Sequence, residues 1–117
     1  MSDGSRWESL ALAHLERAGL ALECRNHRCR LGEIDLLMRD GDILVAIEVR
    51  YRRTDSHGGA AASVTAAKQA RLVGAMRHYL MLRRGPAPVV RFDVVAVSGA
   101  AAQPRIRWLK AAFDAGA

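Results

Sequence analysis

The sequence predicts an α/β fold in which helices flank a mixed central sheet. A helical pattern comes first, three strand patterns follow it, and a second helical pattern precedes a further strand. A chain of 117 residues with 50% hydrophobic and 26% charged residues is typical of one globular domain rather than two. We therefore expect residues 1–117 to form a single domain with the element order αβββαβ.

The first element is predicted to be a helix over residues 5–18. Ser5 is of a type that favours helix N-caps, and Glu8 follows it at the spacing of a capping box. Apolar residues then recur at helical spacing, and Gly19 suits the left-handed conformation that ends many helices. We expect the apolar stripe of this helix to pack on the sheet.

Three strands are predicted next, over residues 20–28, 33–39 and 43–51. Residues 40–42 read Asp-Gly-Asp, a sequence typical of a tight turn between two strands. Consecutive strands joined in this way form an antiparallel meander. The three strands should therefore form one half of the sheet.

The remaining elements lie beyond a glycine- and alanine-rich segment, residues 52–63, which is predicted to be a mobile loop. A helix is predicted over residues 65–84 with Thr65 as its N-cap. An apolar strand follows over residues 89–97, and residues 105–109 resemble a short last strand before a loose end. A strand reached across a helix usually pairs in parallel, so we expect the sheet to be mixed.

The composition points to a cytoplasmic protein with an anionic partner. No uncharged stretch approaches the roughly 18–20 residues of a membrane helix, and the N-terminus shows no secretory signal. The net charge is +6, which favours nucleic acid as the partner. Because 16 of the 18 basic residues are Arg, a GC-rich genome is an alternative source of this charge.

Two other groups of polar residues are less informative. Cys24, His27 and Cys29 lack a fourth zinc ligand, and on a continuous strand the two thiols would point to opposite faces, which favours free thiols. Arg91 and Asp93 share one strand face, where they fit a structural ion pair and a functional site equally well.

Two carboxylates are predicted to face each other across the second hairpin. If Gly41 and Asp42 form a two-residue turn, Asp35 lies directly opposite Glu48. Like charges at this spacing repel unless a cation neutralises them. A divalent metal ion could do so, and so could Arg50, which shares a strand face with Glu48. From the residues alone, a metal site and a structural ion pair both remain open.

Basic residues surround this pair on both sides of the hairpin. Acidic residues within a basic surround are what metal-dependent cleavage of a phosphodiester requires, since the metal orients water while cationic side chains hold the backbone. The candidate nucleic-acid contacts are Arg25, Arg28, Arg30, Arg50, Arg52 and Arg53.

Four segments in order resemble the YraN family of small bacterial proteins. They read GEIDLL at residues 32–37, VAIEVR at 45–50, VTAAKQ at 64–69 and RFDVV at 91–95. The resemblance covers the chain from about residue 7 to residue 97. It implies a restriction-endonuclease-like fold of the PD-(D/E)XK superfamily, which includes Holliday-junction resolvases.

The resemblance also implies roles for individual residues. Asp35 and Glu48 correspond to the metal-binding aspartate and glutamate of the motif, for Mg²⁺ or Mn²⁺. Glu8 is similar to a first-helix glutamate that completes the acidic site in resolvase-like members. Lys68 and Gln69 match the start of the second helix and are expected to assist with phosphate or water, Lys68 also by contacting nucleic acid. Resolvase-like relatives act as dimers, so a homodimer is a further expectation.

The sequence departs from the superfamily pattern at Arg50, where that pattern has lysine. Lysine can shift its pKa and help activate water, whereas arginine stays protonated. Three functions therefore remain open at this point: a metal-dependent nuclease acting on DNA, a catalytically impaired nucleic-acid-binding module, and a scaffold in which the carboxylates only pair with arginines.

Overall fold

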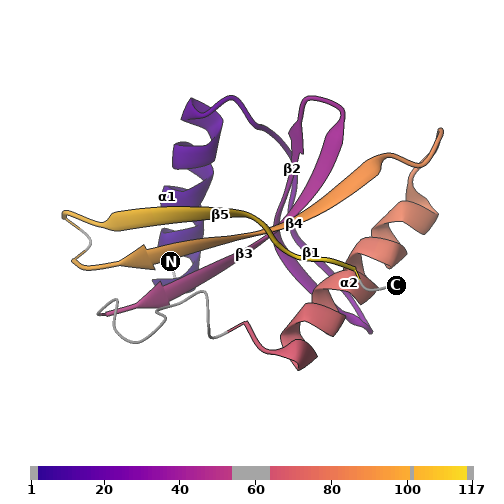
Figure 1. Ribbon diagram of the computed structural model, residues 1–117. Coiled ribbons are helices and arrows are strands. Elements are labelled where there is room, and N and C mark those ends of the chain that lie inside the picture. The colour runs from indigo at the N-terminus through magenta and orange to yellow at the C-terminus, as the bar shows by residue number, and fades with distance from the viewer. Residues whose placement is uncertain (1–2, 54–63, 101, 116–117) are drawn as a thin grey trace.

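The computed structural model describes residues 3–53, 64–100 and 102–115, which form a five-stranded mixed sheet with two helices (Figure 1). Along the chain the elements are α1 (Asp3–Arg17), β1 (Ala21–Cys29), β2 (Gly32–Asp40), β3 (Ile43–Arg52), α2 (Ala66–Leu82), β4 (Val89–Ser98) and β5 (Arg105–Phe113). The predicted α/β class and the predicted order of elements are confirmed, with β5 as an additional full strand. The predicted loop over residues 52–63 lies mostly outside the described residues.

The strands are ordered β1-β2-β3-β4-β5 across the sheet. Neighbours pair antiparallel except for β3 and β4, which are parallel and joined through α2. This arrangement follows from the connections, because short turns join antiparallel strands while a helical crossover joins parallel ones. The sheet is therefore mixed, as the sequence predicts.

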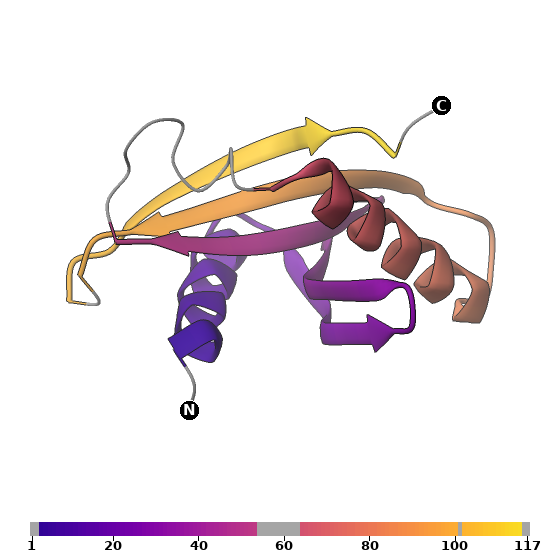
Figure 2. The same cartoon turned by 90° about the horizontal axis from the view of Figure 1, so that it is seen from below.

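The two helices cover opposite faces of the sheet, and they do so at opposite ends (Figures 1 and 2). One hydrophobic cluster contains residues of α1, such as Ala11 and Leu15, packed on one face. The other contains residues of α2, such as Leu72 and Met76, packed on the opposite face. As a result, neither α1 nor α2 covers the part of the α2 face of the sheet that runs along the last residues of β3 and β4 (Figure 2).

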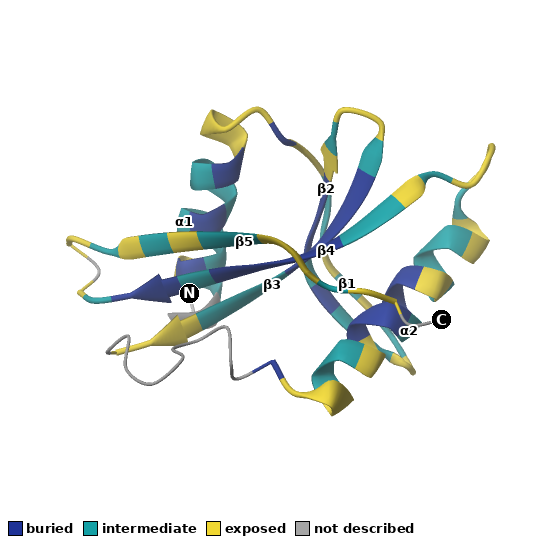
Figure 3. Cartoon of the chain, in the orientation of Figure 1, coloured by how far each residue is buried: buried dark blue, intermediate teal, exposed yellow. Residues whose placement is uncertain are grey.

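Burial follows this layered arrangement closely (Figure 3). The three inner strands β2, β3 and β4 hold the buried residues of the sheet, while the outer surfaces of both helices are exposed. Neither helix in the described part of the chain is long and apolar enough to cross a membrane.

The ends of the helices differ in how well the sequence predicts them. Thr65 caps α2 as expected, its Oγ1 accepting from the Lys68 backbone N–H at 3.3 Å. Gly19 ends α1 with a φ of +102°, and the Leu20 N–H donates to the Leu15 carbonyl. The N-cap predicted at Ser5 is wrong, because α1 already begins at Asp3 and Ser5 lies inside it.

The last strand is longer than predicted. It continues to Phe113, whose ring stacks on Phe92 of β4 at 5.2 Å between centroids. The pairing shifts register between Phe92 and Val94, where the Ala111 backbone takes a φ of +49°. This bulge lets the strand continue, because the Ala111 N–H finds a side-chain acceptor in Asp93 at 3.0 Å. The loose end predicted after residue 109 is therefore wrong as far as Phe113.

Candidate functional site

The two carboxylates of the β2–β3 hairpin lie side by side. Asp40 pairs with Ile43 across the two-residue turn, and the same register continues to Leu36 opposite Ile47. Its next step places Asp35 opposite Glu48, and the two side chains share a hydrogen bond. The Val49 N–H also donates to Asp35 Oδ2 at 2.8 Å, which holds this carboxyl group in place.

This pair retains a proton at neutral pH. Burial raises the pKa of Asp35 to about 8, and the hydrogen bond and negative charge of Glu48 act in the same direction. The Val49 N–H and the charge of Arg50 oppose this increase in pKa. The positive charge near this half-buried pair is therefore too small for both carboxyl groups to ionise at neutral pH.

Arg50 lies close enough to the pair to act on Asp35 electrostatically. It is half-buried on the same strand face as Glu48. Its guanidinium partly offsets the acidic charge, yet the pKa of Asp35 stays well above its ordinary value. Arginine neutralisation alone is thus incomplete at this position.

The carboxylates open into a cavity of about 440 Å³ between the β1–β2 turn and α2. Five of the residues predicted from the sequence line it: Asp35, Glu48, Lys68, Arg28 and Arg30. Arg71 of α2 adds a further cation that the sequence reading missed. The structure thus combines two acids with a cationic rim in one concave site.

Two glycines bring the β1–β2 turn against α2 and so form one wall of this cavity. A Cβ atom on Gly32 would come within 2.3 Å of the Arg71 carbonyl oxygen, and one on Gly74 within 2.9 Å of the Leu31 Cβ. Only glycine allows such a close approach. Arg71 and the exposed Leu31 reach the cavity rim through this contact, for which the sequence offers no local signal.

Glu8 lies beside the pair without lining the cavity. Burial, and next the charge of Asp35, raise the pKa of Glu8. The Asn26 amide, oriented with its nitrogen toward the acids, donates to Glu8 at 3.3 Å and to Glu33 at 3.2 Å. The predicted third acidic residue is therefore near Asp35, held by a neighbouring amide.

The other predicted contacts lie away from the cavity. Arg25 is half-buried against α1, with one guanidinium nitrogen 3.7 Å from Glu8 and 3.3 Å from the Ser9 hydroxyl. Gln69 turns back and donates from Nε2 to the Val64 carbonyl at 3.2 Å. Arg52 and Arg53 are exposed at and just after the end of β3. Position along the chain alone does not show which side chains turn toward the site.

The cysteines differ from their predicted arrangement. Cys24 and Cys29 both pack against the cluster on the α2 face, so the prediction of opposite faces is wrong. The cause is Asn26, whose φ of +54° interrupts the alternation of side chains along β1. Both cysteines are free thiols, as expected, and His27 Nε2 lies 3.1 Å from His78 Nδ1.

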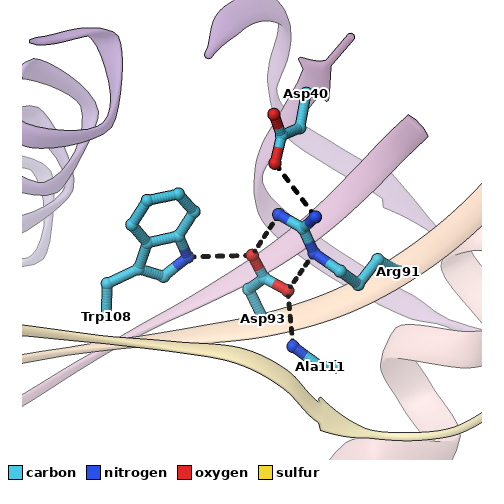
Figure 4. A network of polar contacts seen from close by, with 5 residues as sticks. All are labelled: Asp40, Arg91, Asp93, Trp108 and Ala111. Atoms are coloured by element: carbon cyan, nitrogen blue, oxygen red, sulfur yellow. Dashed lines mark hydrogen bonds and ion pairs between the residues drawn. The ribbon is translucent and has the colours of Figure 1, made fainter. Parts of the chain in front are cut away.

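Asp93 belongs to a structural network on the opposite face of the sheet (Figure 4). It is fully buried, and Arg91 donates to both of its carboxylate oxygens at 2.9 Å. Trp108 Nε1 donates to it at 2.8 Å, while Arg91 also pairs with Asp40 at 3.0 Å. Of the two interpretations open for this residue, the structural ion pair is the one observed.

The donor set at Asp35 and Glu48 suits a hard divalent cation. Mg²⁺ commonly takes one or two carboxylates and completes its octahedron with water and phosphate oxygens. In the described ranges no group of three or more His, Cys, Asp or Glu side chains is arranged to hold a metal ion. The pair would therefore supply two protein ligands, in place of the proton that it now shares, and leave other positions open.

Comparison with known proteins places the chain in a family. The profile of the uncharacterised protein family UPF0102 matches residues 7–97. The chain is 50% identical to a UPF0102 protein of Nitrosomonas europaea, covering 95% of this chain and 92% of that protein. It is 55% identical to one of Methylibium petroleiphilum, covering 96% and 93%, and 54% identical to one of Paracidovorax citrulli, covering 97% and 83%. The resemblance to the YraN family is thereby confirmed: the chain belongs to the uncharacterised protein family UPF0102.

Proposed function

We propose that this protein is a divalent-metal-dependent nuclease with a restriction-endonuclease-like fold that hydrolyses phosphodiester bonds in DNA. The observation that carries this proposal is the hydrogen-bonded pair Asp35 and Glu48 in a cavity with a cationic rim. The element order, a meander followed by a helix and a parallel strand, supports the proposed fold.

The residues of the cavity divide into acids that bind a cation and bases that bind the substrate. Asp35 and Glu48 would hold Mg²⁺ or Mn²⁺, with Glu8 close by as a further acid. When bound, the ion would supply Lewis-acid chemistry and a more acidic water molecule. The Val49 N–H keeps Asp35 oriented toward the shared position.

The cationic rim is suited to hold the DNA backbone. Lys68, Arg30 and Arg71 line the cavity from two sides, so a phosphate seated at the carboxylates would meet positive charge around it. Arg28 is paired with Glu33 at 3.3 Å and its side chain is 73% exposed, so this pair exchanges easily for a phosphate. Arg50 would stabilise negative charge that develops on the phosphate during hydrolysis.

A second candidate is a DNA-binding module that has lost hydrolysis. The observation in its favour is Arg50, a permanent cation that acts on Asp35 where the superfamily pattern has lysine. Such a module would keep the rim and bind DNA in a salt-dependent way, without cutting it.

A metal titration on DNA tests the proposal directly. Purified protein is incubated with Mg²⁺ or Mn²⁺ and plasmid, forked and four-way-junction DNA, and the products are followed on gels. We expect divalent-dependent cleavage that falls at least ~100-fold in Asp35→Ala and Glu48→Ala. Glu16→Gln, an exposed acid of α1, serves as the matched control and should cleave normally. Cleavage that persists in both site variants would contradict the proposal.

Thermal denaturation and an arginine variant separate the two candidates. A bound ion stabilises the folded protein, so Mn²⁺ should raise the melting temperature of the wild type and not that of Glu48→Ala. If the wild type binds DNA and Mn²⁺ without cleaving, the module is favoured. Cleavage that appears only in Arg50→Lys would then identify the arginine as the cause.

A further inference from the structure

A second basic surface lies on the sheet beyond α2. Across β3, β4 and β5, Arg52 pairs in register with Ser98, and Ser98 with Arg105. Two residues along, Ala96 of β4 pairs with Arg107 of β5. Small side chains on the middle strand thus lie between arginines on the two outer strands.

These residues form a hollow. Arg52, Arg105 and Arg107 line a cavity of about 170 Å³ together with Ala96 and Ser98. All three arginines are exposed, and within the described ranges none of them forms an ion pair with a carboxylate. We name this surface the arginine groove, defined by Arg52, Arg105 and Arg107 over Ala96 and Ser98.

The groove shares a sheet face with the carboxylate site. Side chains two residues apart on a strand point the same way, so Glu48 and Arg52 lie on one face of β3, about 13 Å apart along the strand. This is the face that α2 covers at its other end and leaves without a helix here (Figure 2). An extended ligand that reached the carboxylates could therefore continue along β3 into the groove.

The chemistry of the groove fits a sugar–phosphate backbone. Arginines bind phosphate with paired N–H donors, and small residues let a backbone approach the sheet closely. The groove has two rows of paired residues, one with Arg52 and Arg105 and the other with Arg107. The rows are about 7 Å apart along the β-strands, which is comparable with the separation of consecutive phosphates in one DNA strand. A single anion would need only one such row, so the repeated rows favour a polyanion.

We propose that the arginine groove is a second phosphate-binding site, which holds the backbone of the DNA molecule whose scissile phosphate lies at Asp35 and Glu48. The inference rests on the proposed function and extends it: the substrate is a strand or duplex spanning both sites rather than a short end. Arg105 and Arg107 lie beyond residues 7–97, the segment that the family profile matches.

Salt-dependent DNA binding tests the groove. Binding of a fluorescein-labelled 30-base-pair duplex is measured by anisotropy between 50 and 300 mM KCl in the presence of EDTA, for the wild type and for Arg105→Ala/Arg107→Ala. We expect the slope of log K against log[KCl] to decrease in magnitude by about 1.8, and affinity at 0.1 M KCl to fall by roughly tenfold or more.

Two further variants serve as controls. Arg105→Lys/Arg107→Lys keeps both charges, so it should retain the wild-type slope. Arg17→Ala/Arg84→Ala removes two exposed arginines outside the groove, one at the last residue of α1 and one just after α2, and should bind as the wild type does. Circular dichroism of each variant shows that the exposed changes leave the fold intact.

The outcomes distinguish this inference from the proposed function. An unchanged slope in the Arg105→Ala/Arg107→Ala variant, with metal-dependent cleavage intact, overturns the groove and leaves the nuclease. A reduced slope in this variant, together with a wild type that cleaves no DNA, supports the groove and contradicts the proposed hydrolysis. If the wild type does not bind the duplex at any of these salt concentrations, the groove is overturned, and the metal titration on plasmid, forked and four-way-junction DNA decides the proposed function separately.

Discussion

Asp35 is an acidic residue whose raised pKa keeps it protonated, and so uncharged, in the folded protein at neutral pH. Its carboxyl group is held against Glu48 by the hairpin register and by the Val49 N–H, so it cannot move away from the like charge. Burial and the neighbouring acid together favour the protonated form. A cation that replaces this proton gains a site that is already arranged for it.

The protonation of Asp35 makes stability depend on pH. Its folded pKa of about 8 lies above the ordinary value of 3.8, so the folded state binds more protons than the unfolded state between these pH values. In EDTA, we expect the free energy of unfolding to fall by about 1–2 kcal/mol from pH 5 to pH 8.5, with solvent screening reducing the full effect.

The variant Asp35→Asn isolates this contribution, because an amide donates to Glu48 at every pH. Urea denaturation should show it more stable than the wild type at pH 8.5, with the pH dependence of the wild type largely removed. Asp114→Asn, an exposed acid near the C-terminus, should retain the wild-type dependence. A parallel fall in stability for Asp35→Asn and the wild type would contradict the assignment.

At the scale of elements, the site depends on the contact between the β1–β2 turn and α2. Gly32 lies against a backbone carbonyl of the helix, whereas Gly74 lies against the Leu31 side chain. The two contacts differ in what can move, since a helical carbonyl is fixed by its hydrogen bonds and a side chain is not. The contact at Gly32 therefore fixes the position of the cavity wall more strictly than the contact at Gly74 does.

Alanine substitutions should reveal this difference. We expect Gly32→Ala to lower the free energy of unfolding by about 2–3 kcal/mol, since the added methyl group must displace the backbone. Gly74→Ala should cost less, because better helix propensity offsets part of the clash.

A double-mutant cycle checks the cause. Leu31→Gly removes the Cβ atom that the methyl group of Gly74→Ala would meet, so it should rescue that variant alone. Equal rescue of Gly32→Ala, measured by urea denaturation, would show that Leu31 and not the Arg71 carbonyl is its obstacle.

At the scale of the whole molecule, the buried network around Asp93 joins three strands. It connects Arg91 and Asp93 of β4 with Asp40 at the end of β2 and with Trp108 and Ala111 of β5 (Figure 4). Every contact is charge-assisted or satisfies a polar group, and this is how a buried acid is tolerated here. The network supports the sheet from the face that carries α1.

Asp93→Asn should therefore weaken the fold rather than the site. We expect a loss of about 3 kcal/mol in unfolding free energy, because Arg91 loses its buried partner. Asp40→Asn should cost about 1 kcal/mol, since the side chain of Asp40 is 32% exposed. Urea denaturation measures both, and DNA affinity below the unfolding transition should stay unchanged. A larger loss for Asp40→Asn would contradict this ranking.

The features that the sequence predicts correctly are those that depend on residues close together in the chain. A two-residue turn sets the hairpin register, so the opposition of Asp35 and Glu48 follows from a few neighbouring residues. The direction in which Arg25 and Gln69 turn depends on contacts with α1 and with a loop carbonyl, which no periodicity reports. Asn26 is of a type that can adopt a left-handed backbone, but its place within a strand pattern conceals this.

Long-range pairing explains what the sequence could not supply. Arg52 and Arg105 lie on either side of Ser98 only because β3, β4 and β5 adopt one particular register, and the strands come from distant parts of the chain. Arg71 reaches the rim through a close approach at Gly32, which has no counterpart in hydrophobic patterning. Such juxtapositions require the whole sheet.

The parallel pairing of β3 with β4 has a consequence for the order of folding. The β1–β2–β3 meander needs only short turns, whereas β4 can join it only after a long loop closes, with Ile43 meeting Val89. Contacts between residues distant in sequence form slowly, because the loop must close before they stabilise it. The carboxylate pair therefore assembles early, on a local hairpin, and the arginine groove last. A chain arrested between these events would already bring its two acids together while lacking the groove that we propose as its second phosphate-binding site.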